Sequence, residues 1–449
     1  MSTEKHAAAA RKYLKDTAKV DWQDETLWLV RGKRDRLSKQ IPEWEALRDA
    51  ASRIKLYSNS HLPELLEQFE AHAVANGAIV HWAKDAGEYR QIIGGLLQDH
   101  GVRLFVKSKS MLSEECGLVP YLESLGIEAV ETDLGERIIQ LMGLKPSHIV
   151  LPAVHIKREE VGRLFEKEMG TEPGNSDPTY LTHAARRNLR QYFLKVDAAM
   201  TGGNFAVAST GEVVVCTNEG NADMGTSAAP LQIAAFGIDK IVPDRESLGV
   251  FTRLLARTAT GQPVTTYTTH YSAPRKGTEF HIVIVDNGRS RILADREHFR
   301  LLNCIRCGGC MNTCPVYRRS GGYSYSHFIP GPVGVNLGMA SDPDRHKGNL
   351  SACTLCHSCE MVCPAKVDLA EQIYRWRQHY HTSAGKKAIS DGMAFLMGGP
   401  GRFGAGLTVG PGAMKALKAV GGHWGKGREF PDIVSSKNLE SIEKQDHGK

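Results

Sequence analysis

The sequence predicts an α/β domain followed by an α-helical, ferredoxin-like segment that binds two metal clusters. Short apolar runs alternate with helical patterns from residue 78 onward, which indicates a mostly parallel sheet covered by helices. Eight of the ten cysteines lie between Cys304 and Cys363, in two copies of one spacing. Cysteines clustered in this way are typical of metal ligands rather than of a disulfide framework.

Composition limits the class of protein. The 449 residues leave room for several domains, with an ordinary 41% hydrophobic and 24% charged residues. The net charge of +6 is spread along the chain without a basic block, so we expect no nucleic-acid partner. We find no apolar run of about 18 residues and no signal-peptide pattern, and therefore predict no transmembrane segment. The expected location is cytoplasmic, either free or peripheral to the inner face of the membrane.

Residues 1–76 are predicted to be helical. Leu27, Val30 and Leu37 recur at helical spacing. Pro42 and Pro63 suit the starts of helices, and Gly77 suits an end. We therefore place an N-terminal helical segment before the α/β domain.

The α/β domain is predicted to span residues 77–295. Apolar runs bounded by turn residues indicate the strands, and amphipathic stretches between them indicate the helices. The expected strands are 78–82, 102–106, 128–131, 148–154, 205–209, 212–217, 240–242 and 281–285, and the expected helices are 88–97, 116–125 and 135–142.

Two loops of this domain are candidates for binding a ligand. Glu219 and Asn221 follow a strand that ends near Cys216, where α/β folds usually place ligands. A polar turn explains these two residues equally well. The run 107–110 also follows a strand and offers two lysines to an anion, but we favour a solvated loop there.

The cysteine segment, predicted to span residues 296–382, contains two runs of the form C-x2-C-x2-C-x3-C-P. In two-cluster ferredoxins the fourth cysteine of each run binds the other cluster, so we predict two [4Fe–4S] clusters with exchanged ligands. Structural zinc is the less favoured alternative. Cluster 1 would take Cys304, Cys307, Cys310 and Cys363, and cluster 2 would take Cys353, Cys356, Cys359 and Cys314.

The residues after the second run predict a helix and then an appendage. Asp368 and Glu371 have the spacing of a capping box, and Leu369, Ile373 and Trp376 recur at helical spacing. We expect this helix to pack over a cluster. Residues 383–449 are rich in glycine and basic residues, so we expect an appendage with little regular structure.

The combination of segments resembles the iron–sulfur proteins of the bacterial lactate-utilisation family (LutB type). The resemblance is carried by both cysteine runs and by segments 106–111, 130–135, 146–150, 217–221 and 428–431. It implies that the α/β domain is a LUD domain, related to the isomerase and CoA-transferase-like superfamily, joined to a helical ferredoxin. It also implies a three-part complex that oxidises L-lactate to pyruvate.

We therefore expect an electron-transfer subunit with two [4Fe–4S] clusters. Its partners would be the other subunits of such a complex, with electron donor and acceptor proteins or a quinone. The alternative is a stand-alone redox enzyme, or a sensor, that binds a small hydroxy or keto acid in the LUD-type domain. The sequence offers no convincing catalytic dyad, so whether the chain is itself an enzyme stays open.

Overall fold

The computed structural model describes residues 6–380, 384–406 and 408. The chain divides into two compact units, on either side of the bond between Arg377 and Gln378. The first unit holds the α/β domain, the cysteine segment and the N-terminal helices. No helix in the described ranges is both long enough and apolar enough to cross a bilayer.

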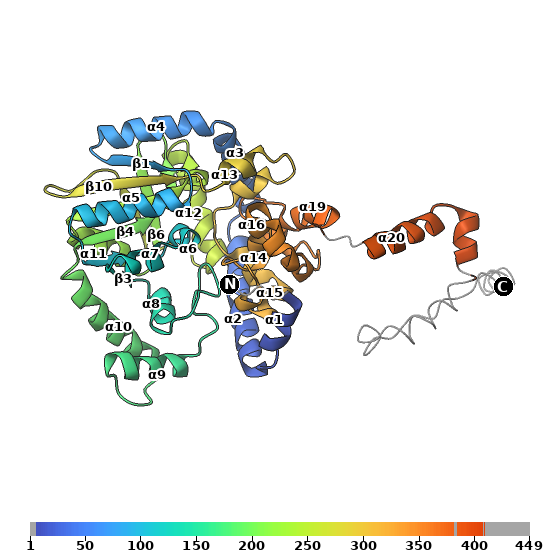
Figure 1. Cartoon of the computed structure of the whole chain (residues 1–449), viewed down its shortest axis with the longest axis horizontal. Helices are drawn as coiled ribbons and strands as arrows, with labels where there is room; N and C mark the ends of the chain where they lie inside the picture. Colours follow the sequence, from blue (N-terminus) through green and yellow to red (C-terminus); the bar gives the residue numbers. More distant parts are fainter. Residues whose placement is uncertain (1–5, 381–383, 407, 409–449) are drawn as a thin grey trace. The chain divides into compact units, whose positions relative to one another are not determined.

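A six-stranded parallel sheet forms the centre of the α/β domain (Figure 1). Its central strands read as continuous apolar runs because helices cover both faces. In order across the sheet the strands are β1 (Ile79–Ala83), β10 (Glu279–Val285), β7 (Leu231–Gly237), β4 (Ala198–Gly202), β2 (Leu104–Lys107) and β3 (Glu128–Glu131). All five pairings are parallel, so every carboxyl end lies at one edge.

Helices pack on the two faces of this sheet. On one face Tyr89 and Ile93 pack against Phe105 of β2, and on the other Phe69 packs against Phe236 and Phe280. The first face is covered by α5 (Ala86–Asp99), α6 (Met111–Cys116) and α7 (Leu118–Ser124), and the second by α4 (Leu62–Ala75). Further helices of the domain are α8 (Leu134–Leu141), α9 (Arg158–Met169), α10 (Pro178–Phe193) and α11 (Asn221–Ala228).

A second, mixed sheet of four strands joins the first to the cysteine segment. Its order is β8 (Ile241–Val242), β5 (Phe205–Val207), β6 (Glu212–Thr217) and β9 (Tyr267–Tyr271), with the 3₁₀ turn η1 (Ile238–Lys240) before β8. Phe205 stacks on Phe251 of α12 (Arg245–Ala259). Ile305 and Cys307 belong to the same apolar cluster, so this sheet's core continues into the first cysteine run.

The cysteine segment is built from short helices around one apolar core. The core includes Tyr317, Val333, Leu350 and Ile373, all fully buried. The α/β domain ends with α13 (Arg289–Ala294). The elements of the cysteine segment are η2 (Phe299–Asn303), α14 (Gly309–Thr313), α15 (Pro315–Ser320), η3 (Gly322–Ser324), α16 (Gly331–Ser341), α17 (Pro343–His346), η4 (Lys347–Ala352), α18 (Ser358–Val362) and α19 (Leu369–Tyr380). The predicted architecture, an α/β domain with a parallel sheet followed by an α-helical segment that carries the eight cysteines, is confirmed.

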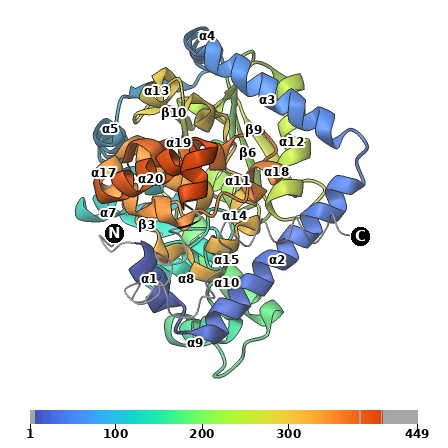
Figure 2. The same cartoon turned by 90° about the vertical axis from the view of Figure 1, so that its right-hand side faces the viewer.

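The N-terminal helices pack on the cysteine segment, although more than 230 residues separate them from it along the chain. They are α1 (His6–Tyr13), α2 (Thr17–Lys39) and α3 (Trp44–Ser60). Helix α2 lies against α14 and α15 (Figure 2). Helix α1 contacts η3, and α3 contacts η2. The helical pattern expected before residue 77 therefore corresponds to helices α1–α4, of which three contact the cysteine segment.

The strand expected at 148–154 is wrong. The segment folds as turns, and His148 and Ile149 are buried against the cysteine segment. Both nitrogens of the His148 ring are engaged, because Nδ1 accepts the backbone N–H groups of Val150 and Leu151, at 3.0 Å each, and Nε2 lies 2.9 Å from Asn312 Oδ1. The apolar residues of segment 148–154 therefore belong to the interface with the cysteine segment rather than to a sheet.

Two further expectations near the C-terminus are wrong. The start of α19 is capped by Glu360, whose Oε1 accepts the N–H groups of Ala370 and Glu371, at 2.8 and 2.9 Å, in place of a capping box on Asp368. In the second unit, α20 (Ala384–Met397) is a regular helix where little regular structure was expected. The rest of the predicted appendage lies almost entirely outside the described residues.

Candidate functional site

Four thiols surround a first cavity in the core of the cysteine segment. Cys304 and Cys307 come from the loop between η2 and α14, Cys310 lies in α14, and Cys363 follows α18. Three of these four cysteines are buried. We call this the first cysteine cavity, and its other walls are Ile149, Ile305, Gly308, Val333, Pro364, Ala365, Val367 and Leu369.

Four other thiols surround a second cavity. Cys353 and Cys356 come from the loop between η4 and α18, Cys359 lies in α18, and Cys314 lies between α14 and α15. Cys356 is exposed, so this second cysteine cavity reaches the protein surface. Its other walls are Tyr325, Gly331, Pro332, Val335, Ala352, Thr354, His357, Ser358, Ala370 and Ile373.

The two cysteine loops repeat one backbone geometry. Arg306 and Leu355 hold equivalent places with φ of 58° and 56°, and their N–H groups donate to Cys304 Sγ and Cys353 Sγ at 3.4 and 3.3 Å. The next left-handed place is Gly308 in one loop and His357 in the other. A Cβ at Gly308 would lie 3.0 Å from the His148 ring, so this loop needs glycine, whereas exposed His357 has room.

The cysteines that precede proline also share one geometry. Cys314 Sγ accepts the N–H of Tyr317 at 3.4 Å, and Cys363 Sγ accepts that of Val367 at 3.2 Å. Hydrogen bonds to sulfur stabilise negative charge on a cluster and are one way in which a protein sets its potential. In each cavity, therefore, the thiol that comes from the other cysteine run accepts a backbone hydrogen bond.

The chemistry of these donors suits two cubane clusters. Burial raises the pKa of the Cys314 and Cys363 thiols to about 11, so the thiolate form needs bound iron to be stable at neutral pH. A [4Fe–4S] cluster takes four thiolates, and each cavity offers four. Assignment of these eight residues as ligands stays a prediction.

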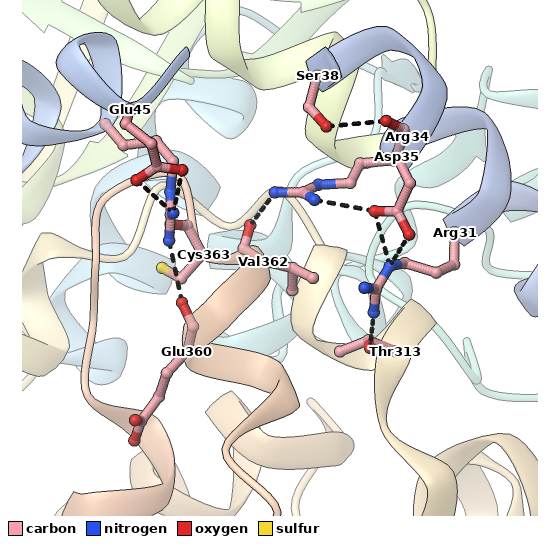
Figure 3. Close-up of polar contacts among 10 residues, drawn as sticks. Arg31, Arg34, Asp35, Ser38, Glu45, Thr313, Glu360, Val362 and Cys363 are labelled. Atoms are coloured by element: carbon pink, nitrogen blue, oxygen red, sulfur yellow. Dashed lines mark hydrogen bonds and ion pairs between the residues drawn. The ribbon is translucent and has the colours of Figure 1, made fainter.

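Arginines from the N-terminal helices hold the ends of the short helices beside these cavities (Figure 3). Arg48 Nε donates to Cys363 O at 2.9 Å and its Nη2 to Glu360 O at 3.1 Å, while Arg34 Nη2 donates to Val362 O at 3.4 Å. Arg31 donates to the hydroxyl of Thr313. These contacts satisfy carbonyls at the C-terminal end of α18, which a five-residue helix leaves without partners.

The apolar face predicted for helix α2, through Leu27, Val30 and Leu37, did not include Arg31 or Arg34. The residues that α2 buries are Val20, Gln23, Leu27, Arg34 and Ser38, whereas Val30 and Leu37 are only partly buried. Arg34 follows Leu27 by seven residues and so lies on the same helical face. Helical spacing could therefore have identified Arg34 as a buried polar residue, and a polar residue on the buried face of a helix indicates a contact with another segment.

A larger cavity of about 350 Å³ lies at the carboxyl edge of the six-stranded sheet. We call it the sheet-edge cavity. Its walls come from residues after β2, β3 and β4, from the end of β7, and from the first cysteine loop, notably Ser108, Asp133, Asn204, Gly237, Arg306 and Cys307. Ile149, Ile305 and Cys307 also line the first cysteine cavity, so the two cavities share a wall.

Glu219 and Asn221 both border the sheet-edge cavity. Glu219 accepts the N–H of Leu134 at 3.0 Å, and partial enclosure by the cavity walls, with Asp133 nearby, raises its pKa to about 7. The amide of Asn221 is engaged by Thr217 and Thr132, at 3.1 Å each. That either residue touches a ligand stays a prediction.

The loop at 107–110 is buried, so the solvated loop favoured from the sequence is wrong. Lys107 is 1% exposed, with its Nζ 2.6 Å from Glu131 Oε1. Lys109 Nζ donates to Val150 O at 3.0 Å, and Ser110 Oγ caps α6. Acidic partners and the neighbouring segment 148–154 replace water around these residues, and no pattern in the sequence indicates these contacts.

His148 makes the stability of the protein depend on pH. Burial lowers the pKa of His148 to about 3, while an unfolded histidine titrates near 6.5. Because the unfolded state then binds the proton more tightly, stability is lost as the pH falls below about 6.5. We expect His148→Gln to flatten the dependence of the unfolding midpoint on pH between 7 and 5. One histidine accounts for at most about 1.4 kcal/mol per pH unit. An unchanged slope would contradict this.

Comparison with known proteins agrees with these features. A family model described as "LUD domain" matches residues 66–293, and one described as "4Fe-4S dicluster domain" matches residues 300–367. The fold and the two cysteine cavities thus define an iron–sulfur protein of the dicluster class with a LUD domain in front. The chain binds two [4Fe–4S] clusters.

The relatives narrow this class further. "Lactate utilization protein B" of Macrococcus caseolyticus strain JCSC5402 is 38% identical, with 78% of this chain and 74% of the relative covered. The protein of the same name from Geobacillus kaustophilus strain HTA426 is 37% identical, with 87% of each covered. The "uncharacterized electron transport protein YkgF" of Escherichia coli strain K12 is 40% identical, with 77% and 74% covered. The chain belongs to the lactate utilization protein B family.

Proposed function

We propose that this chain is the electron-transfer subunit of a complex that oxidises L-lactate to pyruvate. The observation that carries the proposal is the placement of two four-thiol cavities in one apolar core, one beside the sheet-edge cavity and one at the surface. The names of the relatives, which refer to lactate utilization and to electron transport, support the substrate and the role in this proposal.

The eight cysteines are proposed to hold the clusters in the exchanged arrangement. Cys304, Cys307, Cys310 and Cys363 would hold cluster 1, and Cys353, Cys356, Cys359 and Cys314 would hold cluster 2. When bound, each [4Fe–4S] cluster accepts or gives one electron at a time. The two sites together thus match the two electrons that oxidation of a hydroxy acid to a keto acid releases.

The second cysteine cavity is the proposed point of exchange with partner proteins. Cys356 is exposed, and the side chains of His357 and Met361 beside it are 50% and 69% exposed. In the first cavity three of the four cysteines are buried, and arginines of α2 and α3 donate to the carbonyls of Val362 and Cys363 beside it. A partner therefore reaches cluster 2 more closely than cluster 1 from outside.

The partners in this proposal are the other subunits of the complex, with a protein or quinone as the final acceptor. The relatives' names suggest such an assembly. We place it in the cytoplasm, free or on the inner face of the membrane.

A second candidate function is favoured by one observation. The sheet-edge cavity shares Cys307 with the first cysteine cavity, so a small hydroxy or keto acid held there would lie beside cluster 1. In that case the chain is a redox enzyme by itself, or a sensor whose affinity for its ligand depends on the state of the cluster.

Lactate reduction of the clusters separates these candidates. We expect L-lactate to reduce the clusters of the anaerobically purified chain only after its partner subunits have been added, as followed by visible absorbance and EPR. D-lactate is the matched control substrate. Reduction of the isolated chain by L-lactate would establish the stand-alone enzyme instead, and no reduction by the complete complex would contradict both redox functions.

A further inference from the structure

We infer that the sheet-edge cavity binds a small organic acid anion through Arg306, a residue of the first cysteine loop. We also infer that reduction of cluster 1 weakens binding of this anion, and that the bound anion makes cluster 1 harder to reduce. This inference deepens the proposed function and rests on it only in requiring that cluster 1 be redox-active.

Arg306 joins the two sites physically. It lies between Cys304 and Cys307 in the cysteine run, and it lines the sheet-edge cavity. Its left-handed backbone, with φ of 58°, is fixed by the N–H donated to Cys304 Sγ. A group held by its guanidinium is therefore tied to the loop that surrounds cluster 1.

The guanidinium of Arg306 has donor capacity to spare. Its Nη1 is buried and has no hydrogen-bond partner among the described residues, and none of the ion pairs found there includes Arg306. A buried N–H of a charged group without an acceptor is costly, so an acceptor in the cavity stabilises it. The hydroxyl of Ser108, which lines the same cavity, is likewise buried and without a hydrogen-bond partner in the described ranges.

The nearby carboxylates are already engaged by another arginine. Arg289 holds Glu115 at 2.9 Å and Asp239 at 2.6 Å, and these two carboxylates also lie near Arg306. Lys240, 3.8 Å from Asp239, adds a second cation to the cavity wall close to Arg306. The protein thus places two cations together and leaves Arg306 for an external anion.

The cavity suits a small organic acid. A planar guanidinium binds a carboxylate through two parallel hydrogen bonds. The apolar side chains of Met111 and Ile305 line the same space, which suits a short carbon chain beside the carboxylate. Inorganic phosphate shares the anionic chemistry but would leave this apolar wall uncovered.

The position of the site couples binding to the cluster. Reduction adds one negative charge to cluster 1, which shares Cys307 with the cavity wall. The anion therefore binds the reduced protein less tightly, and by reciprocity the bound anion lowers the potential of cluster 1. A tenfold difference in affinity corresponds to about 59 mV for one electron.

The test uses the full chain with both clusters loaded, kept anaerobic. Binding of pyruvate, L-lactate and inorganic phosphate is measured by calorimetry with the clusters oxidised, and again after electrode reduction through methyl viologen. We expect pyruvate to bind the oxidised protein at least threefold more tightly than the reduced protein. Arg306→Gln should weaken binding to the oxidised protein about tenfold, as for loss of a charged hydrogen bond.

The controls keep the result clear. Arg300→Gln removes an exposed cation on η2 outside the cavity and should change nothing. If iron analysis shows that Arg306→Gln lacks a cluster, Ser108→Ala takes its place, with an expected loss of at least threefold. No binding of either acid, equal binding of phosphate, or the same affinity in both redox states would overturn the inference. None of these results bears on whether partner subunits reduce the clusters.

Discussion

Replacing Cys363 by serine is expected to remove cluster 1, although Cys363 belongs to the second cysteine run. Its thiol completes the cavity formed by Cys304, Cys307 and Cys310. Iron should fall from about eight to about four atoms per chain, with the EPR signal of cluster 2 retained. The thermal unfolding midpoint should fall as well, because metal binding is coupled to folding.

Two further variants make this result decisive. Cys314→Ser should have the converse effect, with cluster 2 lost and cluster 1 kept, since Cys314 lines the second cavity. Cys116→Ser removes a buried thiol that lines neither cysteine cavity and should keep about eight irons. Loss of cluster 2 in Cys363→Ser would show that each run binds its own cluster and would contradict the exchanged arrangement.

Replacing Arg48 by methionine is expected to lower the free energy of unfolding by about 3 kcal/mol, since two carbonyls at the end of α18 lose their donor in a buried place. Methionine keeps much of the side-chain volume, which limits the cost of a cavity. Because one of these two carbonyl acceptors belongs to Cys363, cluster 1 should also be lost faster under air. Chemical unfolding and the decay of the visible absorbance measure the two effects.

Arg53→Met is the matched control for this prediction. Arg53 lies on the same helix, α3, but is exposed, so its replacement should change stability little. An equal loss of stability in both variants would show that α3 tolerates no methionine. In that case the contact of Arg48 with the cysteine segment would not explain the effect.

The sequence predicted those strands of the two sheets that are short apolar runs bounded by turn residues. The strand 128–131 was placed at its observed bounds, and 212–217 likewise. Strand β4 was missed because Ala198–Gly202 is rich in small residues, and its assignment depends on the neighbours β2 and β7. The strand prediction at 148–154 was wrong because an apolar run indicates that a segment is buried but not which part of the protein it packs against.

The candidate site also has a part that the sequence predicted and a part that it did not. Repeated spacing was enough to find eight cysteines, because cluster ligands follow one another closely in the chain. The contacts of Arg34 and Arg48 with residues 360–363 were out of reach, since they join positions more than 300 apart. The sheet-edge cavity was partly indicated by Glu219, but its wall at Arg306 comes from another segment and only folding brings the two together.

The sharing of thiols between the two runs also bears on how the protein is made. A chain synthesised from its N-terminus completes the thiols of the second cavity only at Cys359, and those of the first only at Cys363. The first run, though made earlier, encloses no set of four by itself. Both sites thus mature within a few residues of each other, and iron–sulfur delivery has to act on a chain whose N-terminal helices and α/β domain have already been synthesised.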